Sequence, residues 1–272
     1  MLKSVVLAPV GRIMVAGLGD IQHGNEGADL ELVRNHVTFL KETAKRTKSH
    51  LIVVGVGDYV DVFSPSNRDA YNNAKIYRSP RKLVSEKVLI PLVEEVAEVL
   101  KPIKDNIAFL LHGHHYAPIM TEDSVTDTDK LLADMLGTTL KSTGVVVLEI
   151  QQGKDVFRIV CMHGEGGGRT EEYGLRRLRD MLGGWTNIDA IIMGHTHVLS
   201  SLAICQIDAV REANQTNRRN IPILNTGSFL RAYVVGKQTY PEDYGMRPRA
   251  LGGGFLSWSS DETEIQATLR WL

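Results

Sequence analysis

The chain has 272 residues, 43% hydrophobic and 23% charged, which is the composition of an ordinary globular protein with one domain over residues 1–272. Its 31 basic and 32 acidic side chains give a net charge of -1, which removes a bulk electrostatic case for nonspecific nucleic-acid binding. No run approaches the roughly 20 apolar residues of a membrane span, and the apolar start is too short for a good signal peptide. Two cysteines in apolar runs, Cys161 and Cys205, favour free thiols, so we expect a cytoplasmic protein.

Apolar residues at spacings of three and four predict helices over 28–47, 84–100, 127–140 and 171–182. Pro91 is expected to kink the second helix or to begin its later part. Apolar runs between these helices predict strands, and the alternation through about residue 195 favours a layered α/β fold. Beyond residue 195 we expect two paired strands, 198–210 and 220–224, around a polar turn at 212–218. A strand-rich C-terminal extension, 230–272, is expected to end in a hairpin of 254–260 and 264–272.

The segment 64–83 fits no simple element, because it mixes aromatic and cationic side chains with amides. It is either a solvated loop or a substrate loop that supplies those groups to a ligand. Two further loop candidates are 240–249 and 166–169. The candidate substrate-binding residues in these segments are Arg68, Tyr71, Arg78 and Arg169.

Five apolar runs each end in Asp or His beside small glycines, which permit tight turns. The residues at these ends are Asp20, Asp58, His112 to His115, His163, and His195 with His197. In Gly194-His195-Thr196-His197, residues i and i+2 point to the same side of an extended segment, so both rings can converge on one point. Imidazole is a common transition-metal ligand, and buried charges at this density are costly unless paired or metal-bound. The five ends together predict one site.

In this order the blocks resemble the signature of the calcineurin-like metallophosphoesterases, D-x-H, G-D-x-x-D, G-N-H-[DE], H-G and G-H-x-H, and most of all its phage and prokaryotic members. They stand here as Asp20-Ile-Gln22, Gly57-Asp58-Tyr-Val-Asp61, Gly113-His114-His115-Tyr116, His163-Gly164 and Gly194-His195-Thr196-His197. Asn225-Thr-Gly-Ser228 resembles the family's next strand end. The resemblance spans about residues 12–230 and implies a four-layer α/β/β/α sandwich, in which helices flank two mixed sheets.

The resemblance also implies a dinuclear centre of divalent metal ions, with Mn²⁺ favoured and Fe²⁺, Zn²⁺ or Mg²⁺ as alternatives. Two such cations can bind a phosphate, neutralise its charge and activate a water molecule. His115 would lie beside the phosphate as an electrostatic stabiliser or proton donor. Asp58 would bridge the ions, one of which would also be held by Asp20, Gln22 and His197, and the other by His114, His163 and His195.

Two blocks depart from the family pattern. Gln22 stands where the family has His, and the alternation that points it to the side of Asp20 favours it over His23 as the ligand. Its amide oxygen is a harder, weaker ligand than imidazole. The third block has His114 in place of Asn and Tyr116 in place of an acid. Every ligand position nevertheless keeps a residue able to coordinate, and we expect His112 or Asp61 to orient a ligating ring.

We therefore expect a metal-dependent phosphoric ester hydrolase that cleaves a phosphodiester or a phosphomonoester. Its partner is then a phosphoester substrate, with nucleotides and nucleic acids among the candidates, and no membrane. One alternative is a nuclease of the family's DNA-repair branch, for which arginines such as Arg176 and Arg179 could line a groove. The other is a non-catalytic scaffold that keeps the fold. The oligomeric state is left open.

Overall fold

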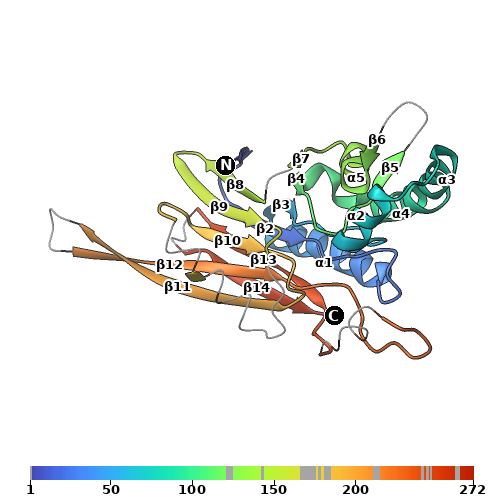
Figure 1. The fold of residues 1–272 in the computed structure, drawn as a ribbon. Helices are drawn as coiled ribbons and strands as arrows, with labels where there is room; N and C mark the ends of the chain where they lie inside the picture. Colours follow the sequence, from blue (N-terminus) through green and yellow to red (C-terminus); the bar gives the residue numbers. More distant parts are fainter. Residues whose placement is uncertain are drawn as a thin grey trace.

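The computed structural model describes residues 2–120, 125–141, 144–165, 176, 179–180, 185–210, 215–239, 242, 245, 247–260 and 264–272. These residues form two mixed six-stranded sheets that pack face to face, and the helices lie against one of them (Figure 1). The expected α/β architecture with two mixed sheets and helices is confirmed. The described residues provide three of its four expected layers. The helix expected over 171–182 lies almost entirely outside them.

The helix-covered sheet has the order β14-β13-β2-β3-β4-β7. Its strands are β2 (Arg12–Leu18), β3 (Ser49–Gly55), β4 (Ile107–Leu111), β7 (Leu140–Lys141), β13 (Gly252–Ser259) and β14 (Gln266–Trp271). Strands β2, β3, β4 and β7 are parallel to one another. Strand β13 pairs antiparallel with both β2 and β14. The C-terminal hairpin is therefore present as expected, and it completes this sheet rather than standing apart from it.

The second sheet has the order β1-β8-β9-β10-β12-β11. Its strands are β1 (Leu2–Ala8), β8 (Val145–Gln152), β9 (Asp155–Met162), β10 (Ala190–Met193), β11 (Leu199–Val210) and β12 (Gln215–Thr226). Strands β9, β10 and β12 are parallel. The β11–β12 hairpin extends away from the body of the protein (Figure 1). Its strands pair as far as Val210 and Gln215, so residues 215–218 of the expected turn belong to β12 instead.

The helices are α1 (Leu30–Thr47), α2 (Pro65–Asn73), α3 (Arg78–Val84), α4 (Ile90–Leu100) and α5 (Thr128–Leu136). Pro91 lies in the first turn of α4, after a π-helical turn over Ser85–Leu89, so it begins the later part of the expected helix. Helix α5 is shorter than expected because Gly137 ends it with φ 67°. A 3₁₀ turn (Lys101–Asn106) precedes β4, and β5 (Pro118–Met120) pairs with β6 (Val125–Asp127).

The interpretation of 64–83 as an irregular loop is wrong, because α2 and α3 occupy most of it. The side chain of Ser64 accepts a hydrogen bond from the backbone N–H of Asn67, and Pro65 begins the helix. An N-cap serine followed by proline is a helix-start signal, and it outweighs the amide-rich composition here.

Alternation along the strands divides the core. In β2, Ile13 and Val15 face the second sheet, whereas Met14 and Ala16 face the helices. A third buried cluster, which includes Val160 and Ile191, covers the opposite face of the second sheet. Among the described residues, no helix is both long and apolar enough to cross a membrane. The two sheets are thus fixed against each other with the carboxyl ends of their parallel strands at a common edge.

Candidate metal centre

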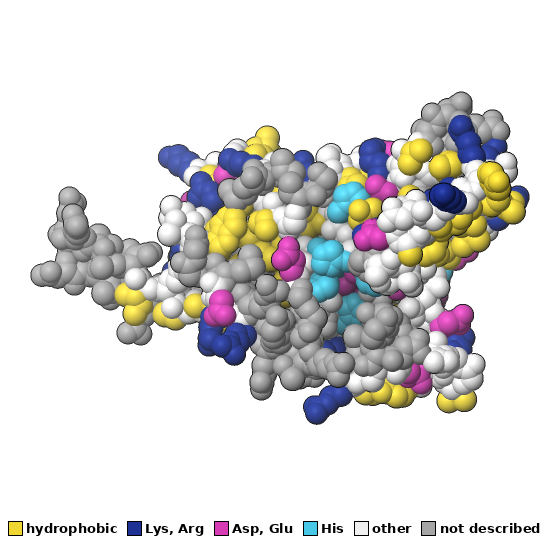
Figure 2. Space-filling model, viewed as in Figure 1, with side chains coloured by type: hydrophobic (Ala, Val, Ile, Leu, Met, Phe, Trp, Pro, Cys, Tyr) yellow, Lys and Arg dark blue, Asp and Glu magenta, His cyan; other side chains and the backbone are white. Residues whose placement is uncertain are grey.

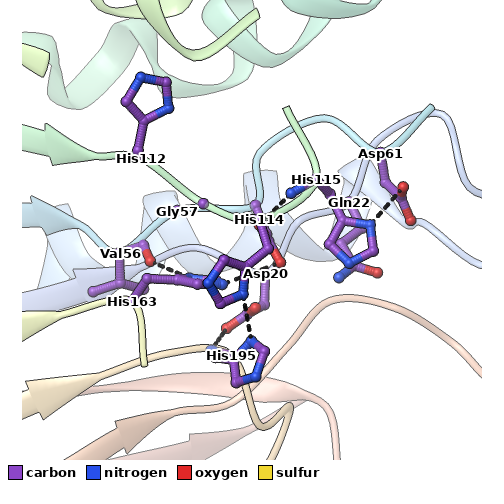
Figure 3. Close-up of polar contacts among 12 residues, drawn as sticks. Asp20, Gln22, Val56, Gly57, Asp61, His112, His114, His115, His163 and His195 are labelled. Atoms are coloured by element: carbon purple, nitrogen blue, oxygen red, sulfur yellow. Dashed lines mark hydrogen bonds and ion pairs between the residues drawn. The ribbon is translucent and has the colours of Figure 1, made fainter. Parts of the chain in front are cut away.

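The five strand ends predicted from the sequence meet at one point between the two sheets. Rings of His114, His163 and His195 face one another there, with centroids 4.6 to 5.0 Å apart, and Asp20 lies beside them (Figure 3). His114 follows β4, whereas His163 and His195 follow β9 and β10 of the other sheet. Figure 2 shows the histidines together in a hollow of the surface. The site is therefore built jointly by both sheets.

His163 is held in an orientation that suits a metal ligand. Its Nδ1 donates a hydrogen bond to the carbonyl oxygen of Val56 at 2.6 Å. Its Nε2 then lies 3.3 Å from Oδ2 of Asp58 and has no hydrogen-bond partner within the described chain. A backbone acceptor on one ring nitrogen that directs the other toward an ion is the usual support of a metal-bound histidine.

Asp58 organises the loop that carries His114. Its Oδ1 accepts the backbone N–H groups of His114 and His115 at 2.5 and 3.0 Å. The loop can fold this closely over Asp58 because Gly113 has no side chain, and a Cβ there would clash with the Asp58 backbone. Oδ2 remains directed toward His163.

Gln22 and His197 form the other side of the cluster, next to Asp20. Nε2 of Gln22 lies 3.0 Å from Nε2 of His197, which is 3.5 Å from Oδ1 of Asp20. Gln22 is buried at 1% exposure, whereas His23 turns outward to Oε2 of Glu95 at 2.7 Å. The geometry therefore places Gln22, and not His23, in the cluster.

Several buried polar atoms of the cluster lack a hydrogen-bond partner within the described part of the chain. They include Oδ1 of Asp20, Oε1 of Gln22 and Nε2 of His163. An unpaired buried polar atom costs about 1–3 kcal/mol, so several in one place need another partner. Potential ligand atoms of Asp20, Asp58 and His163 lie within 4.8 Å of one another, as do those of His114, His163 and His195. Carboxylate, amide and imidazole donors at such spacing fit a divalent cation.

The electrostatics of the carboxylates agree with this fit. Burial, together with the charge of Asp58, raises the pKa of Asp20 to about 7. Burial opposes ionisation of Asp58 as well, but His163 and His115 hold the pKa of Asp58 well below its ordinary value. Burial disfavours the charged form of His163, yet Asp58 raises the pKa of its ring to about 9. The buried carboxylates thus depend on positive charge beside them, which the His163 ring carries here and which a divalent cation would supply in its place.

The backbone is left-handed at most of the ligand positions. The φ angles there are 48° at Asp20, 50° at Gln22, 55° at Asp58, 70° at His195 and 56° at His197. Such conformations are uncommon outside glycine and cost of order 1 kcal/mol or more each. Their concentration here indicates that the fold holds these side chains in place against local backbone preference.

His115 lies next to the cluster rather than within it. Its Nδ1 donates to Oδ1 of Asp61 at 2.8 Å, which fixes the ring (Figure 3). Burial disfavours the charged ring, but this hydrogen bond and the charge of Asp58 raise the pKa of His115 above its ordinary value. Asp61 thus orients the ring of His115. His112 orients none of the candidate ligands, because its ring faces away from the cluster, with Nδ1 of His112 3.2 Å from Oδ2 of Asp129.

Two residues outside the predicted site support it. Asp129, at the start of α5, is fully buried and accepts the backbone N–H of Gly113 at 3.0 Å. Asn225, near the end of β12, is also buried, and its Nδ2 donates to Oγ1 of Thr196 between the two histidines at 2.5 Å. The strand-end position of Asn225 is visible in the sequence, whereas nothing in the sequence around Asp129 indicates its role.

The candidate substrate-binding residues have other contacts. Arg68 donates to the carbonyl oxygens of His114 and Tyr116 at 2.5 and 3.1 Å, with its guanidinium 4.0 Å from the Tyr116 ring centroid. Tyr71 stacks on Phe63 at 4.9 Å, and Arg78 begins α3 with an exposed side chain. Arg169 lies outside the described residues. Of the three that lie in the described part of the chain, only Arg68 is brought to a loop of the cluster, and it binds backbone atoms there.

No protein-family model and no curated protein sequence matches the chain. Three solved structures are similar to it over 95% of its length. They are a predicted phosphoesterase from Streptococcus pneumoniae (13% identity, 98% of that chain, TM-score 0.36), a metallophosphoesterase from Sphaerobacter thermophilus (10%, 88%, 0.38) and the anchor protein of the inner membrane complex of Plasmodium (11%, 84%, 0.34). All three likenesses are weak, with at most 13% identity and TM-scores of 0.34 to 0.38.

Proposed function

We propose that this chain is a divalent-metal-dependent phosphoesterase that hydrolyses a phosphodiester or a phosphomonoester. The observation that carries the proposal is the convergence of two buried carboxylates, an amide and four imidazoles on one point, with unpaired ligand atoms directed inward. In a polar cluster with a purely structural role, such buried groups would be hydrogen-bonded to one another. In a metal site, the lone pairs of the ligand atoms stay available for the cation.

We assign the residues to two ligand sets that share Asp58. On one side His197 lies beside both Gln22 and Asp20, and on the other the ligand atoms of His114, His163 and His195 lie within 4.8 Å of one another. Cations bound there would neutralise the charge of a phosphoryl group and activate a water molecule as its attacking nucleophile. The amide oxygen of Gln22 beside the carboxylate of Asp20 favours Mn²⁺, with Fe²⁺, Mg²⁺ and Zn²⁺ as alternatives.

His115 is the residue that we assign to the phosphoryl group itself. It follows His114 directly, and its backbone is fixed by Asp58 and its ring by Asp61. Because the pKa of His115 is raised, its protonated ring is favoured relative to that of an ordinary histidine. It can therefore stabilise the negative charge of the phosphoryl oxygens or donate a proton to the leaving oxygen.

The proposal is tested with bis(p-nitrophenyl) phosphate, p-nitrophenyl phosphate and DNA in the presence of Mn²⁺, Fe²⁺, Mg²⁺ or Zn²⁺. Turnover is expected with the wild type, and a loss of at least about 10³-fold with Asp58→Asn, which keeps the shape of the side chain. Asp105→Asn, at an exposed carboxylate in the turn before β4, is the matched control and keeps full activity. Absence of turnover from folded protein with every metal contradicts the proposal and favours a scaffold. Turnover of DNA alone favours a nuclease.

A further inference from the structure

A pocket of about 250 Å³ opens beside the candidate metal centre. It lies at the edge of the second sheet, between the start of β8 and the ends of β9 and β10. His114 and His163 form part of its wall. The same two side chains belong to the candidate ligand cluster. A phosphoester held at that cluster therefore has one of its ester groups at the mouth of this pocket.

Apart from the polar side chains of His112 and Glu165, the remaining wall of the pocket is apolar. Val145, Met162 and Met193 line it, and all three belong to the third apolar cluster on the outer face of the second sheet. Figure 2 shows this apolar surface next to the histidines. Gly164 leaves room for Met193, because a Cβ at Gly164 would lie 3.0 Å from the Met193 sulfur. Thioether side chains adapt to the shape of flat apolar groups, which makes such a wall suited to an aromatic ring.

The charged side chains of the pocket do not favour a second phosphate group. No lysine or arginine is among the described residues that line it, and Glu165 stands there with a carboxylate. A second phosphate in the pocket would meet the like charge of Glu165, and its only cationic partners among the described lining residues would be histidines. The apolar part of the wall, which no charged group interrupts, therefore suits an uncharged occupant. Its size fits as well, since a cavity of roughly 150 Å³ is known to hold benzene.

We propose that this pocket binds a planar aromatic substituent of the phosphoester substrate, which makes the substrate an aryl or nucleoside-type ester rather than a simple alkyl one. The inference rests on the proposed phosphoesterase function. It assigns Val145, Met162 and Met193 to substrate specificity, and it leaves the hydrolytic step to the cluster. The aromatic group contributes through KM, because it is buried equally before and during the reaction.

The kinetic test compares phenyl p-nitrophenyl phosphate with methyl p-nitrophenyl phosphate, which share one leaving group. The wild type is expected to show a KM about tenfold lower for the phenyl ester, with similar kcat. Val145→Asp brings a charge into the pocket and abolishes this preference, and the isosteric Val145→Thr reduces it. Val156→Asp is the matched control, because Val156 is an exposed valine of the β8–β9 hairpin. Turnover without a phenyl preference, or a preference that survives Val145→Asp, overturns the inference and leaves the phosphoesterase proposal intact.

A second measurement is independent of turnover. In metal-free protein, the methyl NMR signals of Met162 and Met193, assigned with Met→Leu variants, are expected to shift with millimolar diphenyl phosphate and not with dimethyl phosphate. Val145→Asp removes these shifts and Val156→Asp keeps them. If no metal supports turnover, this titration alone tests whether the pocket binds an aromatic group. Shifts that depend on Val145 support the aromatic pocket, and their absence overturns it.

Discussion

His163 and Val56 are joined by a 2.6 Å hydrogen bond from a ring nitrogen to a backbone carbonyl, across the interface of the two sheets. This contact fixes which nitrogen of His163 faces the cluster, since Nδ1 is used and Nε2 points toward Asp58. The packing of one sheet on the other therefore determines the tautomer of a candidate metal ligand. Metal binding and global stability are coupled through the same residues.

Addition of Mn²⁺ to chelator-treated protein should raise the melting temperature. At one hundred times the dissociation constant, binding stabilises the folded state by about 2.7 kcal/mol, or roughly 5–10 °C for a chain of this size. His163→Ala should lose most of this rise. His50→Ala, at the start of β3 and away from the cluster, should keep it. A rise of equal size in His163→Ala would contradict the ligand assignment, and scanning calorimetry measures it.

Arg68→Met should reduce metal affinity and kcat about tenfold while leaving KM within twofold. The reason is that Arg68 holds the carbonyl oxygens of His114 and Tyr116, so its loss loosens the loop of a ligand. Lys75→Met, an exposed cation in the same segment, is the control. A variant with raised KM and unchanged kcat would instead favour direct contact of Arg68 with substrate.

Asp61→Asn should lower kcat by 10- to 100-fold without a change in metal affinity. An amide is a weaker acceptor for Nδ1–H of His115 than a carboxylate, so the ring loses both its orientation and the favoured protonated form. Isothermal titration with Mn²⁺ and steady-state kinetics measure the two quantities separately. Equal losses of metal affinity and kcat would place Asp61 among the supports of the metal centre instead.

His36 should make the protein sensitive to acid. It lies in α1 at 0% exposure against Phe229, and neither ring nitrogen has a hydrogen-bond partner within the described residues. Burial, with a contribution from Arg270, lowers the pKa of His36 from 6.5 to about 3. The unfolded chain thus binds a proton that the folded one excludes, so stability present above pH 6.5 falls steadily toward pH 3.

The variant His36→Leu should therefore lose less stability than the wild type between pH 6.5 and pH 4. His50→Leu, at a histidine whose side chain is only partly buried, should follow the wild type. Urea unfolding at each pH gives the free energies. Parallel pH profiles for the wild type and His36→Leu would show that the neutral ring of His36 is not the source of the acid sensitivity.

The strand ends were predictable because buried parallel strands read as apolar runs, and their carboxyl ends meet wherever such sheets form. The alternation expected for Asp20 and Gln22 does not hold, because both residues have positive φ instead of the extended backbone that alternation requires. The helices within 64–83 were not predicted, because an amide-rich composition is typical of loops and the cap at Ser64 is the local signal of a helix start.

Other features leave no local trace in the sequence. Asp129 reaches Gly113 from a different element, and only the packing of α5 against β4 brings them together. The strand β8 was not anticipated, although it provides Val145 and pairs with β1 and β9. Contacts of this kind depend on tertiary arrangement, which residue patterns along one segment do not contain.

The left-handed backbone at the ligand positions limits which residues can be exchanged there. Aspartate and histidine are among the few side chains that accept positive φ readily, and four of the five positions carry them. A β-branched residue at Asp20, Asp58, His195 or His197 would strain the chain whatever its chemistry. Attempts to retune the metal preference by selection should therefore recover mostly Asp, Asn and His at these positions. Gln22, the one long side chain among the five, has the same left-handed backbone, so a β-branched residue would be strained there as well.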